Sequence, residues 1–95
     1  MVITVLEAHV DADHWVAFQT DYKNRTKHLP PQMVQTFLLQ SAMDQTLWQI
    51  VSVWKSREAL DEMRNSGETP EGVIMFRNAG TEPKLSIFNV PAAAP

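Results

Sequence analysis

A chain of 95 residues with 44% hydrophobic residues has enough apolar side chains for one small domain with a modest core. Its net charge of -3 and its interspersed charges, without a basic stripe, argue against a nucleic-acid-binding surface. The chain contains no cysteine, which excludes disulfides, thiolate metal sites and a cysteine nucleophile. No signal peptide and no apolar run of about 20 residues is visible, so we expect a cytoplasmic protein that does not enter a membrane.

The N-terminal third of the chain predicts a strand followed by a helix. The strand is expected over Val2–Val10, where β-branched residues are frequent. Asp11 follows as a predicted N-cap, and the helix runs to about Lys27. Its buried stripe is expected to consist of three aromatic residues at helical spacing, Trp15, Phe18 and Tyr22.

The middle of the chain predicts a hairpin. The expected strands, Met33–Ala42 and Thr46–Trp54, are separated by a short polar break, so they should pair as antiparallel neighbours. The second strand is apolar on both sides, with Leu47, Val51 and Val53 on one side and Trp48, Ile50 and Trp54 on the other. We therefore expect this strand to be covered on both faces.

Two short helices are expected between the hairpin and the end of the chain. The first, about Arg57–Ser66, follows an N-cap at Ser56 and ends before a glycine. The second begins with Thr69 as N-cap and Pro70 in its first turn, and it ends at Gly80.

A last strand over Lys84–Val90 completes the order β-α-β-β-α-β, with one extra short helix. This order is typical of an α+β ferredoxin-like split βαβ fold, a four-stranded antiparallel sheet with its helices on one face. We expect one domain, residues 1–90, and a disordered tail, residues 91–95. Because the strands are apolar on both sides, the open sheet face would expose a large apolar surface. A homodimer packed through that face is the predicted remedy.

A family resemblance supports this architecture. The run Val53-Trp54-Lys55-Ser56, followed by Glu58-Ala59-Leu60, resembles the strand-to-helix signature of antibiotic-biosynthesis-monooxygenase-like domains. The closing Phe88-Asn89-Val90 and the overall spacing agree, so the likeness spans most of Val2–Val90. The resemblance implies a dimeric α/β barrel. Members of the group include cofactor-independent oxygenases of quinols and anthrones, haem-degrading enzymes and proteins without known activity.

The haem-degrading branch of that group has a residue pattern that this chain lacks. The branch uses an Asn on the first strand, a Trp on the second helix and a His on the next helix. Here the corresponding positions offer Glu7 or Ala8, then Met63, and no histidine within Thr69–Gly80. The departure argues against haem degradation, and haem binding without degradation remains a weaker alternative.

Two residues are candidates for proton transfer. His9 shares one side of the first strand with Glu7, and a carboxylate beside an imidazole forms an acid–base pair. The alternative is a polar pair at the seam of the dimer. Tyr22 is the second candidate, through its hydroxyl. The histidines lack the i, i+4 spacing of a helical metal site, so no metal is predicted, and no fingerprint supports a flavin, a nicotinamide or another cofactor.

Large apolar side chains are the candidates for a substrate pocket between helices and sheet. They are Phe18, Trp54, Met63, Met75 and Phe76. The alternative is that each belongs to the core, with Trp54 filling the corner where strand meets helix. Two functions remain open: a cofactor-independent monooxygenase of a small quinol- or anthrone-like aromatic, and a non-catalytic dimer that binds a small ligand or serves as a stress or regulatory protein.

Overall fold

Four antiparallel strands form a single sheet with the order β2-β3-β1-β4 in the computed structural model, which describes all 95 residues. The strands are β1 (Val2–His9), β2 (Met33–Gln40), β3 (Leu47–Trp54) and β4 (Lys84–Asn89). The helices are α1 (Trp15–Arg25), α2 (Arg57–Arg64) and α3 (Glu71–Asn78), and a short 3-10 turn, η1 (Ala12–His14), precedes α1. The predicted ferredoxin-like α+β fold is therefore confirmed.

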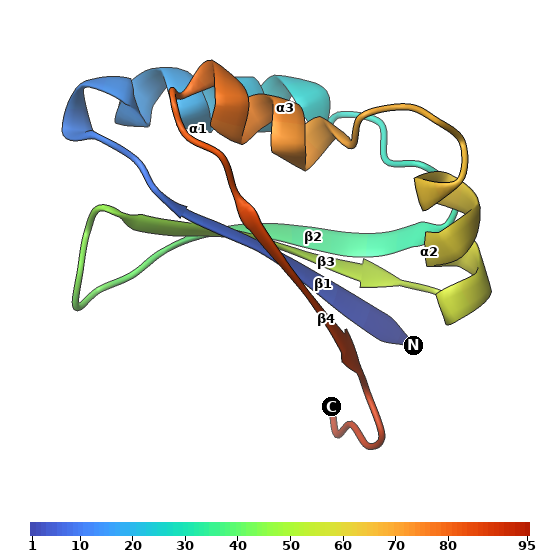
Figure 1. Cartoon of the computed structure of the whole chain (residues 1–95). Coiled ribbons are helices and arrows are strands. Elements are labelled where there is room, and N and C mark those ends of the chain that lie inside the picture. The colour runs from blue at the N-terminus through green and yellow to red at the C-terminus, as the bar shows by residue number, and fades with distance from the viewer.

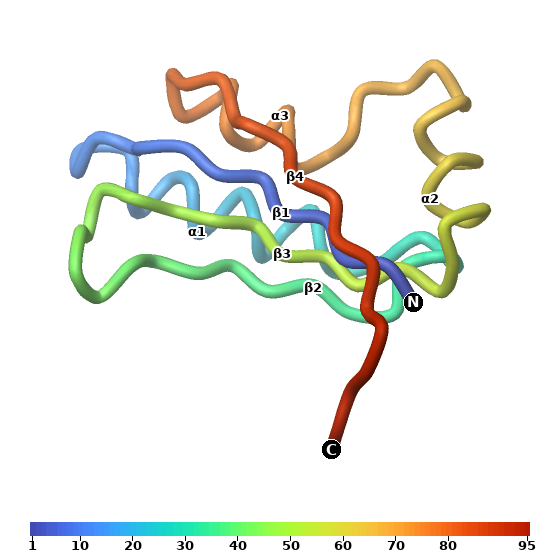
Figure 2. The backbone as a smooth tube through the Cα atoms, turned by 60° about the horizontal axis from the view of Figure 1, so that its bottom comes forward, coloured from blue at the N-terminus to red at the C-terminus, as the bar shows by residue number.

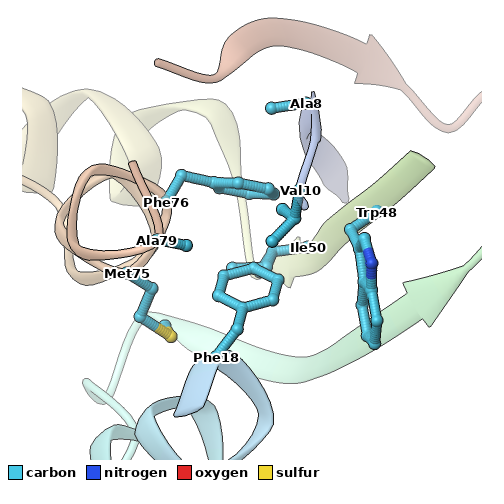
Figure 3. Close-up of a cluster of buried hydrophobic side chains, with 8 residues drawn as sticks. All are labelled: Ala8, Val10, Phe18, Trp48, Ile50, Met75, Phe76 and Ala79. Carbon is cyan, nitrogen blue, oxygen red and sulfur yellow. The ribbon is translucent and has the colours of Figure 1, made fainter. Parts of the chain in front are cut away.

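The helices lie on one side of the sheet (Figure 1). Helices α1 and α3 run over one face, and α2 stands at the end of the sheet where β3 finishes. Under α1 and α3 lies the main core, in which Phe18 of α1 and Phe76 of α3 extend toward the same space beside Val10 and Ile50 (Figure 3). A second, smaller cluster of Val2, Trp54 and Leu60 lies under α2.

The opposite sheet face carries no helix, and its strands present apolar side chains there, as predicted. Ile3, Val5, Val51 and Val53 are only half-buried. Toward the sheet edges Phe37, Leu39 and Phe88 are 44%, 43% and 52% exposed. The two-sided apolar pattern of β3 is therefore real, and one of its faces is open to solvent in the single chain.

Of the three predicted N-cap residues, one is confirmed and two are wrong. Ser56 caps α2 as predicted, because its Oγ accepts a hydrogen bond from the Ala59 N–H at 3.0 Å. Asp11 makes no side-chain cap; the chain instead winds into η1, and the His14 N–H donates to the Asp11 carbonyl at 2.9 Å. Thr69 does not cap α3, since Pro70 occupies the N-cap position.

Two glycines follow the helices α2 and α3. Gly67 and Gly80 have φ values of 81° and 84°, the left-handed conformation that glycine adopts without strain. Pro91–Pro95 lies outside every helix and strand and runs away from the sheet (Figure 2), and its disorder stays a prediction. None of the helices combines the length and apolar composition that a bilayer-spanning segment needs.

Candidate functional site

A cavity of about 500 Å³ lies between the covered face of the sheet and the helices. Strands β1, β2 and β3 form its floor, while α2, α3 and the segment after α1 contribute its walls and rim. Most of its lining side chains are apolar or small. The hydrophobic ones are Leu6, Leu29, Met33, Ile50, Trp54, Leu60, Met63, Val73, Met75 and Leu85.

The cavity exists because the covered face has two separate apolar clusters. Along β3, Ile50 belongs to the main core and Trp54 to the smaller cluster, and Ser52 lies between them. Thr4 lies opposite Ser52 on β1, so both positions between the clusters carry short side chains. Short side chains leave unfilled the space that larger residues occupy on either side.

Helix α3 closes one end of the cavity. A Cβ atom on Gly72 would lie 2.6 Å from Cδ1 of Leu6, so the helix approaches β1 more closely than a larger residue permits without movement of Leu6. Gly72 therefore sets how near the start of α3 lies to the floor.

Three hydroxyls stand on the floor of the cavity in one row across the sheet. Thr36 and Thr4 both lie opposite Ser52, on either side of β3. Thr36 Oγ1 and Ser52 Oγ share a hydrogen bond of 3.2 Å, and the Trp54 Nε1–H donates to Thr4 Oγ1 at 3.0 Å. Thr4 and Ser52 are 8% and 6% exposed. The floor is thus a buried polar strip between apolar clusters.

Ionisable side chains gather at the rim. They are Arg25, His28, Arg64, Glu68 and Glu71. Arg25 ties α1 to α3, because its Nη1 donates to Glu71 Oε2 at 2.6 Å and its Nε donates to Asp21 Oδ1 at 2.6 Å. These hydrogen bonds, Glu71 first and Asp21 second, raise the pKa of the Arg25 guanidinium above its usual value. Arg25 therefore stays charged and holds the two helices together at the mouth.

The residues expected from the sequence to form a pocket divide into two groups. Trp54, Met63 and Met75 line the cavity. Phe18 and Phe76 do not; their rings pack against each other in the main core with centroids 4.9 Å apart. These two phenylalanines therefore belong to the core, which was the alternative to a place in the pocket.

Neither candidate for proton transfer lines the cavity. The His9 side chain is 67% exposed, and its Nδ1 lies 2.9 Å from Thr46 Oγ1 and 3.7 Å from Asp44 Oδ2. Glu7 does not pair with His9, because it accepts a hydrogen bond from Gln49 Nε2 at 2.7 Å. Tyr22 is half-buried and packs against the main core.

Sequence reasoning missed the hydroxyl row. The available signal was present on both strands: Ser52 is the one polar residue on an otherwise apolar side of β3, and Thr4 is the one polar residue on the side of β1 that carries Val2, Leu6 and Ala8. His28 was also missed as a lining residue, because no sequence pattern places the loop after α1 beside the sheet.

The cavity does not fit a haem held by a histidine of α3. Helix α3, Glu71–Asn78, contains no histidine, and the histidine that lines the cavity is His28, an exposed residue of the rim. No group of three or more His, Asp or Glu side chains lies close enough to hold a metal ion.

Comparisons with known proteins agree with the fold. The sequence matches the model of a protein family described as antibiotic biosynthesis monooxygenase, over residues 1–72. A putative antibiotic biosynthesis monooxygenase from Deinococcus radiodurans is 11% identical, with 100% of this chain and 97% of that one covered and a TM-score of 0.76. One from Nitrosomonas europaea is 19% identical, with 97% and 100% covered and a TM-score of 0.72.

A third structural relative binds a large ligand. The heme degrader MhuD from Mycobacterium tuberculosis, solved with two hemes in its active site, is 17% identical, with 100% of both chains covered and a TM-score of 0.76. At such identities the likeness shows the fold alone. A search of curated proteins gives no match.

Proposed function

This chain belongs to the antibiotic biosynthesis monooxygenase family, and we propose that it oxygenates a small aromatic substrate of the quinol or anthrone type in the cavity between helices and sheet. The observation that carries the proposal is the cavity itself. It has about 500 Å³ of space, a lining surface that is more apolar than polar and a strip of hydroxyls on its floor. An apolar cleft with a few polar groups is the usual form of a small-molecule site.

The proposed reaction needs a proton acceptor. For an anthrone-type substrate, a CH₂ group loses a proton, and the resulting enolate supplies electrons to O₂. The peroxide anion that forms at this carbon takes the removed proton back and becomes a hydroperoxide, which then loses water and leaves a C=O group. One oxygen atom of O₂ enters the product and the other leaves as water, so atoms and electrons balance. The protein contributes by orienting the substrate and by taking the first proton.

His28 is the residue that we assign to proton removal, because it is the histidine that lines the cavity and its side chain is exposed at the rim. His28→Gln should lower the rate of oxygen uptake about 100-fold, the lower end of the usual contribution of a general base. Oxygen uptake is measured with 1,8-dihydroxyanthrone and naphthalene-1,4-diol, after subtraction of the buffer rate. His14→Gln, which changes a histidine outside this cavity, is the matched control.

Three outcomes separate the possibilities. Wild-type uptake no faster than buffer, with both substrates, would contradict the oxygenase. Full activity in His28→Gln together with loss in His9→Gln would return the proton-transfer role to His9. Loss in His28→Gln alone would support the assignment.

A non-catalytic ligand-binding protein is the second candidate. Its support is that the ionisable lining residues stand at the rim, where His28, Arg64, Glu68 and Glu71 are all exposed. In that case naphthalene-1,4-diol, kept under nitrogen, raises the melting temperature of the wild type, while uptake in air equals the buffer rate.

We also propose that two copies of the chain pack through their open sheet faces. The support is the row of half-exposed and exposed apolar side chains on that face, which a monomer would leave in water. A two-fold axis would bring the same patch of each copy together.

A further inference from the structure

The hydroxyl row on the cavity floor contains hydrogen-bond donors without acceptors. Each Thr or Ser hydroxyl has one hydrogen to donate and two lone pairs to accept. The bond between Thr36 and Ser52 uses one hydrogen of the pair. Thr4 only accepts, from Trp54 Nε1, so its own hydrogen has no acceptor in the chain. Of the hydrogens on Thr4, Ser52 and Thr36, only one is engaged within the protein.

These hydroxyl donors are both buried and next to an open space. Thr4 and Ser52 are more than nine-tenths buried, and all three residues line the cavity. Each of the three hydroxyls already has one hydrogen-bond partner in the chain, so none is wholly unsatisfied, but each can make further hydrogen bonds. Here the space next to the unused donors is the cavity, so a ligand atom that accepts hydrogen bonds can complete them.

We propose that the hydroxyl row of Thr4, Ser52 and Thr36 binds the ionised oxygen of the substrate, a phenolate or an enolate. This deepens the proposed function, on which it rests, by naming the residues that hold the oxygen at which a quinol or an anthrone ionises. An apolar cavity by itself disfavours an anion, whereas donated hydrogen bonds favour the charged form. The row therefore acts on the same oxygen that becomes negative when the substrate loses its proton.

Trp54 gives the row a fixed geometry. Its indole N–H holds Thr4 Oγ1 from one side, which leaves the hydroxyl hydrogen of Thr4 free to point elsewhere. On the other side of β3, the bond to Thr36 restrains Ser52 in the same way. Donors that are already oriented need little reorganisation when charge develops near them.

The test uses 4-nitrophenol, a chromogenic phenol whose ionised form absorbs at longer wavelength than its neutral form. A pH titration of the bound dye gives its pKa on the 95-residue chain. The main variant is the double substitution Ser52→Ala and Thr36→Val, which removes both members of a bonded pair and leaves no buried group unpaired. We expect the pKa of the bound dye to rise by about one unit, which is a tenfold weaker preference for the phenolate.

A second pair of variants keeps the test decisive if the double substitution fails to fold. Thr4→Val should raise the pKa of the bound dye by a similar amount, and Thr4→Ser, which keeps the hydroxyl, should restore it. Thr20→Val, at an exposed position on α1, is the matched control and should leave the pKa unchanged. 4-Nitroanisole, which cannot ionise, should bind equally to the wild type and the double variant.

The pKa of the bound dye either supports or overturns the proposed anion site. An equal pKa of the bound dye in the wild type, the double variant and Thr4→Val would overturn the anion site, and so would failure of the dye to bind. Because 4-nitrophenol is not turned over, the outcome is independent of oxygen uptake. A pKa difference without uptake keeps the anion site and removes the oxygenase; uptake without a pKa difference does the reverse.

Discussion

Replacing Phe76 by alanine should lower the free energy of unfolding by about 3–5 kcal/mol, the usual loss for a fully buried phenylalanine. Phe76 is 0% exposed, and its ring packs on Phe18, so it joins α3 to α1. The loss has two parts, the lost burial of the ring and the cavity that it leaves. A domain of this size has about 5–15 kcal/mol of stability in total, so a large share of the variant should be unfolded on mild warming.

Urea denaturation followed by tryptophan fluorescence measures the change. Val16→Ala is the control, because Val16 lies on α1 and is 77% exposed. Its effect should stay within about 0.5 kcal/mol. A loss below 1 kcal/mol for Phe76→Ala would mean that α3 is not held by the main core.

Val51→Lys should convert the proposed dimer into folded monomers. Val51 lies in the middle of the open sheet face, opposite Val5 on one side and Phe37 on the other. In a dimer packed through this face, the lysine ammonium would be buried among apolar side chains without a partner, which is strongly unfavourable. In a monomer the same lysine points to water, so the fold of the chain itself should survive.

Light scattering at low micromolar concentration gives the molecular mass. The wild type should show twice the chain mass of 10.8 kDa, and Val51→Lys should show 10.8 kDa. Val16→Lys introduces the same charge on the helical side and should remain dimeric. A wild type that is already monomeric, or a dimeric Val51→Lys, would show that the open face is not the interface.

Periodicity in the sequence was sufficient for the fold. The alternation in β3 divided its side chains into two apolar sets, and the structure shows that the set of Trp48, Ile50 and Trp54 is the one buried under the helices. The Ser56 cap was predictable because a single side chain and its own helix determine it. Asp11 was not, because the chain there has two ways to enter the helix, and the tighter 3-10 turn is the one it takes.

The site could be predicted only in part. Residues two apart on a strand share a face but stand about 7 Å apart, so cross-strand neighbours compete for their side chains. Glu7 is therefore bonded to Gln49 and not to His9. Likewise, the spacing of Phe18 and Met63 marks both as inward-facing, but only the packing of α1 and α2 against the sheet decides which one meets the cavity.

The five methionines offer the most direct test of the cavity as the ligand site. Met33, Met63 and Met75 line it, whereas Met1 and Met43 are 60% and 97% exposed and lie elsewhere. Methyl-labelled methionine NMR, during an anaerobic titration with naphthalene-1,4-diol, reports all of them at once. We expect the methyl signals of Met33, Met63 and Met75 to shift together and to saturate, while those of Met1 and Met43 stay in place. Saturable shifts confined to Met1 or Met43, or no shift in the three lining methionines, would contradict the cavity as the binding site.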